Sequence, residues 1–114
     1  MFRIENPDTP DLLAAEPEQV TVLLENKRVR VLEVRAPVGA KQAMHWHPDH
    51  IVYPLGAYRL NHIAQDGTIT IGERRLADVV WIPSESHAGE NIGDTEIHSF
   101  DCRVAGAGQH RVAP

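Results

Sequence analysis

Histidines gather in one part of this sequence at a spacing that suits a metal ion. One short stretch holds His45, His47 and His50. Residues two apart on a β-strand project to the same face, with side chains roughly 6–7 Å apart at their bases. His45 and His47 could therefore converge on one ion, at about 2.0–2.2 Å per bond. Pro48 breaks the strand, and a turn there could return His50 toward the same point. A fourth imidazole, His87, follows a later strand.

Two alternatives to this metal site stay open. A His-x-His pair often consists of two surface histidines that bind nothing. Three histidines within one predicted core strand and its turn are harder to explain in that way, because desolvating several imidazoles is costly unless something satisfies their nitrogens. Asp49, beside the cluster, could replace His50 as the third ligand. Imidazole suits several transition metals, so iron, zinc and nickel are all candidates for the one divalent ion.

Two spaced patterns in the chain resemble the two sequence motifs of the cupin superfamily. The residues Gly39, His45 and His47 match the first half of motif one, and His87 with Asn91 matches the end of motif two. The resemblance runs from about residue 20 to residue 104 and is to small single-domain members, the monocupins. It implies a double-stranded β-helix that holds one divalent metal ion. The implied metal ligands are His45, His47, His50 and His87.

The chain departs from the family pattern at the third ligand. Where motif one usually has a glutamate, this sequence has His50, which makes the site an all-histidine variant. Four neutral ligands leave a divalent ion with a net charge near +2, whereas a set with one glutamate leaves about +1. A bound water should then be more acidic, and anionic or enolisable substrates should bind more readily. The turn of motif two is altered as well, because the segment from Pro83 to His87 contains no glycine.

Short apolar runs separated by turn residues predict an all-β domain. From Val20 onward, runs of Val, Ile and Leu alternate with Gly and Pro, and the pair Asp66-Gly67 predicts a hairpin. No segment keeps a 3.6-residue period, so little helix is expected beyond one turn after Asp11. The predicted strands are Val20–Glu25, Val29–Arg35, Ala43–His47, His50–Pro54, Tyr58–Ile63, Thr68–Ile71, Val79–Ile82, Ser86–Asn91 and Glu96–Val104. They predict a sandwich or jelly roll after a short irregular N-terminal arm, and the resemblance to cupins narrows this to a double-stranded β-helix, or jelly-roll, barrel.

Alternation along the last strand predicts which of its side chains point inward. One face carries His98, Phe100, Cys102 and Val104. The other face carries Ser99, Asp101 and Arg103, which belong in water by this reasoning. His98 should then point into the barrel, where it is the candidate catalytic residue, a proton carrier. Alternatively, it is a core histidine bonded to a carbonyl. His62, which shares a strand face with Tyr58, is a weaker pocket candidate.

The resemblance implies a metalloenzyme that acts on a small organic molecule. All-histidine cupins similar to this sequence include diketone-cleaving dioxygenases, so Fe(II)-dependent dioxygen chemistry on an enolisable compound is one expectation. A second is a zinc or nickel Lewis-acid cyclase or isomerase, because zinc held by four histidines resembles the site of cupin polyketide cyclases. A third, from another class, is a non-catalytic ligand-sensing or metal-binding module.

Length and composition bound the partners. The 114 residues suit one domain, which we place at residues 20–105, between an arm over residues 1–19 and a flexible tail over residues 106–114. A formal net charge of -5 and the lack of clustered basic residues argue against nucleic acid, and no apolar run is long enough to span a membrane. The single cysteine, Cys102, excludes an internal disulfide and favours a cytoplasmic protein. Resembling cupins are commonly dimers, so we expect a homodimer.

Overall fold

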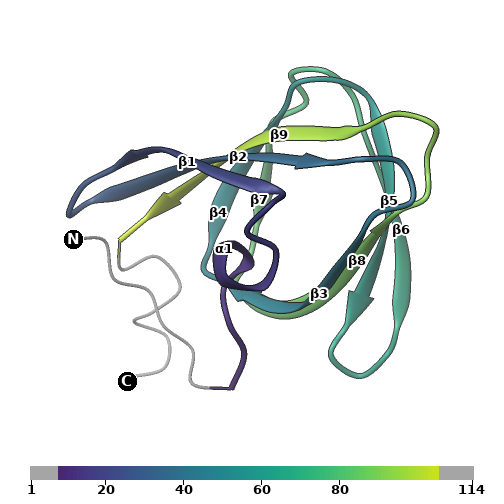
Figure 1. The fold of residues 1–114 in the computed structure, drawn as a ribbon, viewed down its shortest axis with the longest axis horizontal. Helices are drawn as coiled ribbons and strands as arrows, with labels where there is room; N and C mark the ends of the chain where they lie inside the picture. Colours follow the sequence, from purple (N-terminus) through teal and green to yellow (C-terminus); the bar gives the residue numbers. More distant parts are fainter. Residues whose placement is uncertain (1–7, 106–114) are drawn as a thin grey trace.

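The computed structural model describes residues 8–105, and within them it has one short helix and nine strands (Figure 1). The elements are α1 (Leu12–Ala15), β1 (Val20–Glu25), β2 (Val29–Ala36), β3 (Lys41–His47), β4 (His50–Pro54), β5 (Tyr58–Ala64), β6 (Ile69–Arg74), β7 (Val80–Ile82), β8 (Glu85–Asn91) and β9 (Ile97–Val104). Every predicted strand is present, with small shifts at the ends, so the all-β prediction is confirmed. No helix among residues 8–105 has the length and hydropathy that a membrane span requires.

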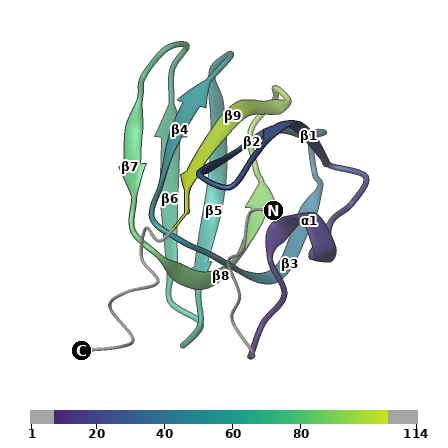
Figure 2. The ribbon, with the colours of Figure 1, turned by 90° about the vertical axis from the view of Figure 1, so that its left-hand side faces the viewer.

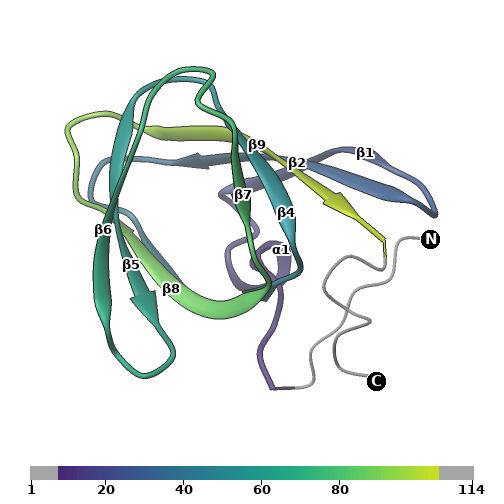
Figure 3. The same ribbon diagram turned by 180° about the vertical axis from the view of Figure 1, so that it is seen from behind.

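The strands form two sheets that face each other across the interior of a barrel (Figures 1 and 3). One sheet has the strand order β1-β2-β9-β4-β7, and the other has the order β3-β8-β5-β6. All of the strand pairings are antiparallel. Consecutive strands such as β3 and β4 lie in different sheets, which is the jelly-roll arrangement expected from the sequence. The chain therefore passes from one sheet to the other at Pro48, between two histidine-bearing strands.

The described part of the N-terminal arm covers an edge of its own barrel. Asp11 caps α1, its Oδ1 accepting the backbone N–H of Ala14 at 2.9 Å, as the predicted helical turn requires. Backbone groups of β3 then bond to the arm, with Trp46 N–H donating to Pro10 O at 2.7 Å. Because β3 is the outer strand of its sheet, these contacts protect an otherwise open edge (Figure 2). Residues 1–7 of the arm and the predicted tail, 106–114, lie outside the described residues.

The apolar core occupies only one part of the interior. It consists of Leu12, Val20, Leu32 and Val34, with Leu13 packed against it. Leu32, on β2, has no solvent exposure, and α1 supplies the apolar cover for this end of the barrel. Much of the remaining interior is buried but polar, and it includes histidines and a charged pair. Burying polar groups costs free energy unless they are hydrogen-bonded or paired.

The two faces of β9 are the reverse of the sequence prediction. Ser99, Asp101 and Arg103 are buried at 3%, 6% and 2% exposure, whereas Val104 is 50% exposed. Asp101 stands opposite Leu32 on β2 and opposite Val52 on β4, and both of these side chains are buried. Residues that pair across strands share a face, so Asp101 points into the barrel. The prediction assumed that the apolar set of β9 lies inside, but on this strand the polar set faces the interior and the apolar set faces outward.

Candidate functional site

Four histidines from three strands meet inside the barrel. His45 and His47 lie on β3, His87 lies on β8 directly opposite His45, and His50 begins β4 in the other sheet. The ring centres of His45 and His87 are 4.6 Å apart, those of His47 and His87 are 4.8 Å apart, and those of His47 and His50 are 4.5 Å apart. The structure thus brings together the four residues that the sequence indicated as metal ligands.

Backbone carbonyls orient three of these rings. The Nδ1 atom of His45 lies 2.7 Å from Ala43 O, and those of His47 and His50 lie 3.0 Å and 2.9 Å from Pro48 O. A carbonyl oxygen only accepts hydrogen bonds, so Nδ1 carries the proton and donates in each case. This tautomer leaves Nε2 with its lone pair, which is the form in which imidazole binds a metal. Pro48 both ends the strand and fixes two neighbouring rings.

The rings are neutral because they are buried. Burial lowers the pKa of His47 to about 2, helped by the nearby His50 and His87, and lowers the pKa of His87 to about 3. The pKa values of His45 and His50 are lowered as well, again chiefly by burial. Two buried ring nitrogens, His47 Nε2 and His87 Nδ1, have no hydrogen-bond partner among the described residues. Unsatisfied buried nitrogens point to a missing partner.

The donor chemistry fits a metal ion, but the present ring orientations do not form a finished site. Two imidazoles that share an ion hold their ring centres roughly 4.5–5 Å apart, which is the spacing of three of the pairs in this cluster. Within residues 8–105, however, no group of three or more His, Cys, Asp or Glu side chains is arranged to hold an ion as it stands. Binding would therefore require at least one ring to turn.

The cluster opens onto a cavity of about 500 Å³ between the two sheets. Besides the four histidines, its wall includes apolar side chains from both sheets, among them Val34, Val52, Leu60 and Ile82. A volume of this size falls within the range of pockets that bind small organic molecules. The mixture of apolar walls with a few convergent polar groups is also typical of such pockets.

Comparison with known proteins shows what this barrel resembles. No family model matches the chain, and no curated protein matches it. Among solved structures, it is similar to a cupin domain from Bordetella pertussis, with a TM-score of 0.69 and 24% identity over 87% of this chain and 98% of that chain. It is also similar to an RmlC-like cupin family protein from Methanocaldococcus jannaschii (TM-score 0.61, 10% identity, 100% of this chain and 95% of that chain). This chain has the cupin fold.

A further match of this cupin is to the polyketide cyclase RemF from Streptomyces resistomycificus, with a TM-score of 0.62 and 17% identity. The alignment covers 94% of this chain and 81% of RemF. Identities at this level show a shared fold, so the chemistry of the cupin pocket has to be argued from its own residues.

His98 lies outside the cupin pocket, so the expectation that it points inward is wrong. It stands on the outer face of β9 at partial exposure, and its Nε2 lies 2.6 Å from Glu33 Oε2 on the neighbouring strand β2. His98 and Glu33 are therefore a cross-strand pair on the surface of the sheet. The physical reason is the reversal of β9 described above, which turns His98 outward and Asp101 inward.

Asp49, the alternative third ligand, bonds to the turn that precedes β8. Asp49 is buried at 2% exposure, and its Oδ1 accepts the backbone N–H of Ser84 at 2.8 Å. Ser84 belongs to the shortened turn that precedes His87. The carboxylate thus holds the backbone of the turn that leads into β8.

Several pocket residues were missed or underrated by the sequence reasoning. His62 stacks on His87 with ring centres 4.6 Å apart, and its Nε2 lies 2.9 Å from Glu85 Oε1. Tyr58 lines the cavity, and burial raises the pKa of its phenol to about 12. Asp101 and Arg103 line it from β9. Alternation along β5 places Tyr58 and His62 on one face, so the sequence indicated these two residues. No local pattern showed that Asp101 and Arg103 lie on the inner face of β9.

Proposed function

We propose that this cupin binds one divalent metal ion through His45, His47, His50 and His87 and acts on a small organic molecule in the adjoining cavity. The observation that carries the proposal is the pair of buried, unpartnered nitrogens, His47 Nε2 and His87 Nδ1, inside a cluster of neutral rings. Imidazoles that are held neutral by burial need not lose a proton to become ligands. The cavity of about 500 Å³ beside them leaves room for a substrate.

The other pocket residues would orient the substrate and exclude water. When bound, the ion would supply Lewis acidity or, in the case of iron, a position for dioxygen. The raised pKa of Tyr58 keeps its phenol protonated at neutral pH, so it can donate a hydrogen bond to a substrate oxygen. Glu85 holds the ring of His62 against His87 through the 2.9 Å contact. Apolar walls keep the reacting group away from bulk water.

The site supports an enolisable or anionic substrate better than a neutral apolar one. Four neutral ligands leave the charge of a divalent ion uncompensated by its first coordination shell, and such a centre attracts anions and polarises carbonyls. Fe(II)-dependent dioxygen chemistry and zinc- or nickel-dependent cyclisation or isomerisation both use these properties. The fold match to the polyketide cyclase RemF agrees with the second possibility, and the identity of the metal decides between the two.

Elemental analysis by plasma mass spectrometry tests this function. We expect about one iron, zinc or nickel ion per chain in untagged protein, and a clear loss of that metal in the His50→Ala variant. His98→Ala is the matched control, because His98 lies on the outer face and should leave the metal content unchanged. Iron would direct the work to oxygen-uptake screens, and zinc or nickel to cyclisation and isomerisation assays. If reconstituted protein holds no metal above background, the proposal is wrong.

We also propose that the protein is a homodimer, formed through the outer face of the five-stranded sheet. Ile51 and Tyr53 on β4 are each 39% exposed, and Trp81 on β7 is 59% exposed. Trp81 stands directly beside Ile51 on this face. On the same face Glu33 bonds to His98, and Arg35, which stands opposite His98, pairs with Glu96. Each of these carboxylates thus has a partner within its own chain, and a second identical face would pack against the apolar part of the surface.

Light scattering coupled to size-exclusion chromatography measures the oligomeric state directly. We expect a mass of about twice the 12.7 kDa of one chain, and a shift toward the single-chain mass for Trp81→Lys, which places a charge in the proposed contact. Lys41→Ala, at an exposed position of β3 in the other sheet, is the control and should remain dimeric. A wild-type mass near 12.7 kDa at micromolar concentration would rule the dimer out.

A further inference from the structure

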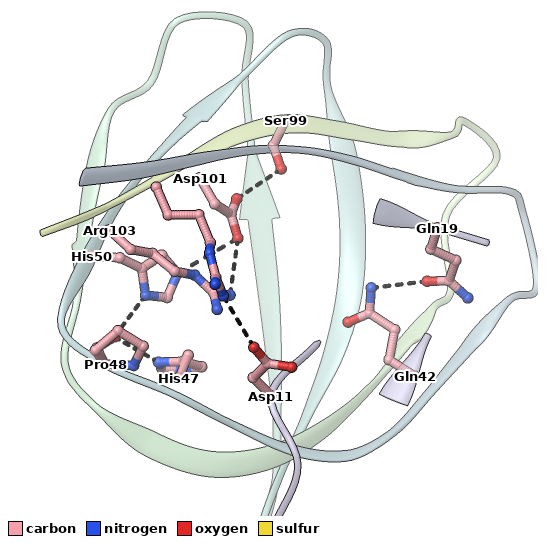
Figure 4. Close-up of polar contacts among 10 residues, drawn as sticks. Asp11, Gln19, Gln42, His47, Pro48, His50, Ser99, Asp101 and Arg103 are labelled. Atoms are coloured by element: carbon pink, nitrogen blue, oxygen red, sulfur yellow. Dashed lines mark hydrogen bonds and ion pairs between the residues drawn. The ribbon is translucent and has the colours of Figure 1, made fainter. Parts of the chain in front are cut away.

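The cupin pocket contains a buried cation with few partners. Arg103 points from β9 into the barrel at 2% exposure and lines the cavity (Figure 4). Its Nε is buried and has no hydrogen-bond partner among residues 8–105. Its ion pair with Asp101 joins Nη2 and Oδ2 at 3.8 Å, which is longer than a hydrogen bond. A buried guanidinium is costly unless it is paired and hydrogen-bonded.

The neighbouring carboxylates have other partners. Asp101 also accepts the hydroxyl of Ser99 at 3.2 Å, and its Oδ2 lies 3.7 Å from His50 Nε2 (Figure 4). Asp11 lies 3.3 Å from Arg30, which is the cation that it pairs with. Burial lowers the pKa of Arg103, and the charges of Asp101 and Asp11 only partly oppose this effect. The positive charge of Arg103 is thus incompletely compensated by the protein.

We propose that Arg103 binds the carboxylate of a small organic acid inside the barrel. The planar guanidinium presents paired N–H donors that match the two oxygens of a carboxylate. A monocarboxylate suits the site best, because Asp101 beside Arg103 would repel a more highly charged anion. Apolar side chains from both sheets, among them Val52, Leu60 and Ile82, also line the cavity and would contact an apolar body attached to that carboxylate. The substrate class is therefore a carboxylic acid with an apolar skeleton.

The position of Arg103 connects this inference with the histidine cluster. Arg103 stands directly opposite His50 in the pairing of β9 with β4. A carboxylate held by Arg103 would therefore lie next to the cluster, with its skeleton in the cavity. The proposed function is needed only for the reaction that would follow binding of the carboxylate. The recognition itself depends on Arg103 and not on a metal ion.

Binding of benzoate and of benzamide to the full-length, metal-free protein tests the inference. The two probes have nearly the same shape, but only benzoate carries a charge. We expect benzoate to bind about tenfold or more tightly than benzamide by calorimetry. Arg103→Gln should abolish this preference, and Arg103→Lys should weaken it, because an ammonium lacks the fork. Arg35→Gln is the matched control, since Arg35 is exposed and pairs with Glu96 at 2.7 Å outside the cavity.

A second measurement needs no variant, in case removal of Arg103 prevents folding. In nitrogen-15 spectra of the wild-type protein, the Nε–Hε resonance of Arg103 should shift on addition of benzoate and stay in place with benzamide. Equal affinities for the two probes, no binding of either at millimolar concentration, or a preference that persists in Arg103→Gln would each overturn the inference. Because these experiments use metal-free protein, they can fail while the metal analysis succeeds, or succeed while it fails.

Discussion

Lowering the pH of the metal-free protein from 7 to 5 is expected to reduce its free energy of unfolding by about 4 kcal/mol. His47 and His87 carry this effect, because burial lowers their pKa values to about 2 and about 3. In the unfolded chain these histidines titrate near pH 6.5, so below that pH the unfolded state binds protons that the folded state does not. The contribution of these two histidines to the free energy of unfolding is therefore largest above about pH 6.5, and it is lost progressively as the pH falls.

The size of this loss is large compared with the stability of a small domain, which is typically about 5–15 kcal/mol. Each of the two histidines contributes about 2 kcal/mol between pH 7 and pH 5, and the lowered pKa values of His45 and His50 add to the sum. Urea unfolding at pH 7, 6 and 5, in the presence of a chelator, measures it. Carboxylates titrate mainly below pH 5, so their protonation adds little to the change in the free energy of unfolding between pH 7 and pH 5. A change of less than about 1 kcal/mol across the window would contradict buried, neutral rings.

Replacing His47 with methionine is expected to weaken metal binding by about 100-fold or more while making the metal-free protein less sensitive to acid. His47 is central in the cluster, with His50 and His87 each within 5 Å of it by ring centre. Methionine fills a similar volume and leaves no unpaired Nε2 in the interior. The loss of stability between pH 7 and pH 5 should shrink by about 2 kcal/mol, because one titrating group is gone.

Zinc competition titrations and urea unfolding at the two pH values measure the two effects on the same variant. His98→Met is the control for both, because His98 lies on the outer face beside Glu33 and should affect neither the metal nor the acid sensitivity of the pocket. If His47→Met binds zinc as tightly as the wild type, His47 is not a ligand. If the acid sensitivity is unchanged, the burial of His47 is not its cause. Weaker zinc binding together with a smaller loss of stability in acid would indicate that His47 serves metal binding at a cost in stability.

The buried pair of Asp101 and Arg103, like His47, places polar groups in the interior at a cost in stability. A barrel filled only with apolar side chains would avoid the cost of burying these charges. Here the apolar core around Leu32 is confined to one part of the interior, and polar groups line the cavity beside it. On β4, Ile51 and Tyr53 alternate with buried residues and lie on the outer face, where we expect a second copy to cover them.

The sequence by itself determined the elements of this protein and the members of its histidine cluster. Strand positions follow from local information, since apolar runs and turn residues such as Asp66-Gly67 act within a few residues. The structure places His45 opposite His87, in agreement with the resemblance to cupins, which implied that both belong to one site. The helical turn after Asp11 is equally local, because a capping side chain needs only the next three residues.

Only the tertiary structure decided which face of β9 is inside. Alternation separates the residues of a strand into two sets, but it does not say which set meets the core, because that depends on the strands on either side. Leu32 and Val52, the buried neighbours of Asp101, come from distant parts of the chain. The same dependence on distant strands placed Arg103 in the cavity and His98 outside it. Burial of charge is a property of the assembled barrel, and no local pattern in the sequence reports it.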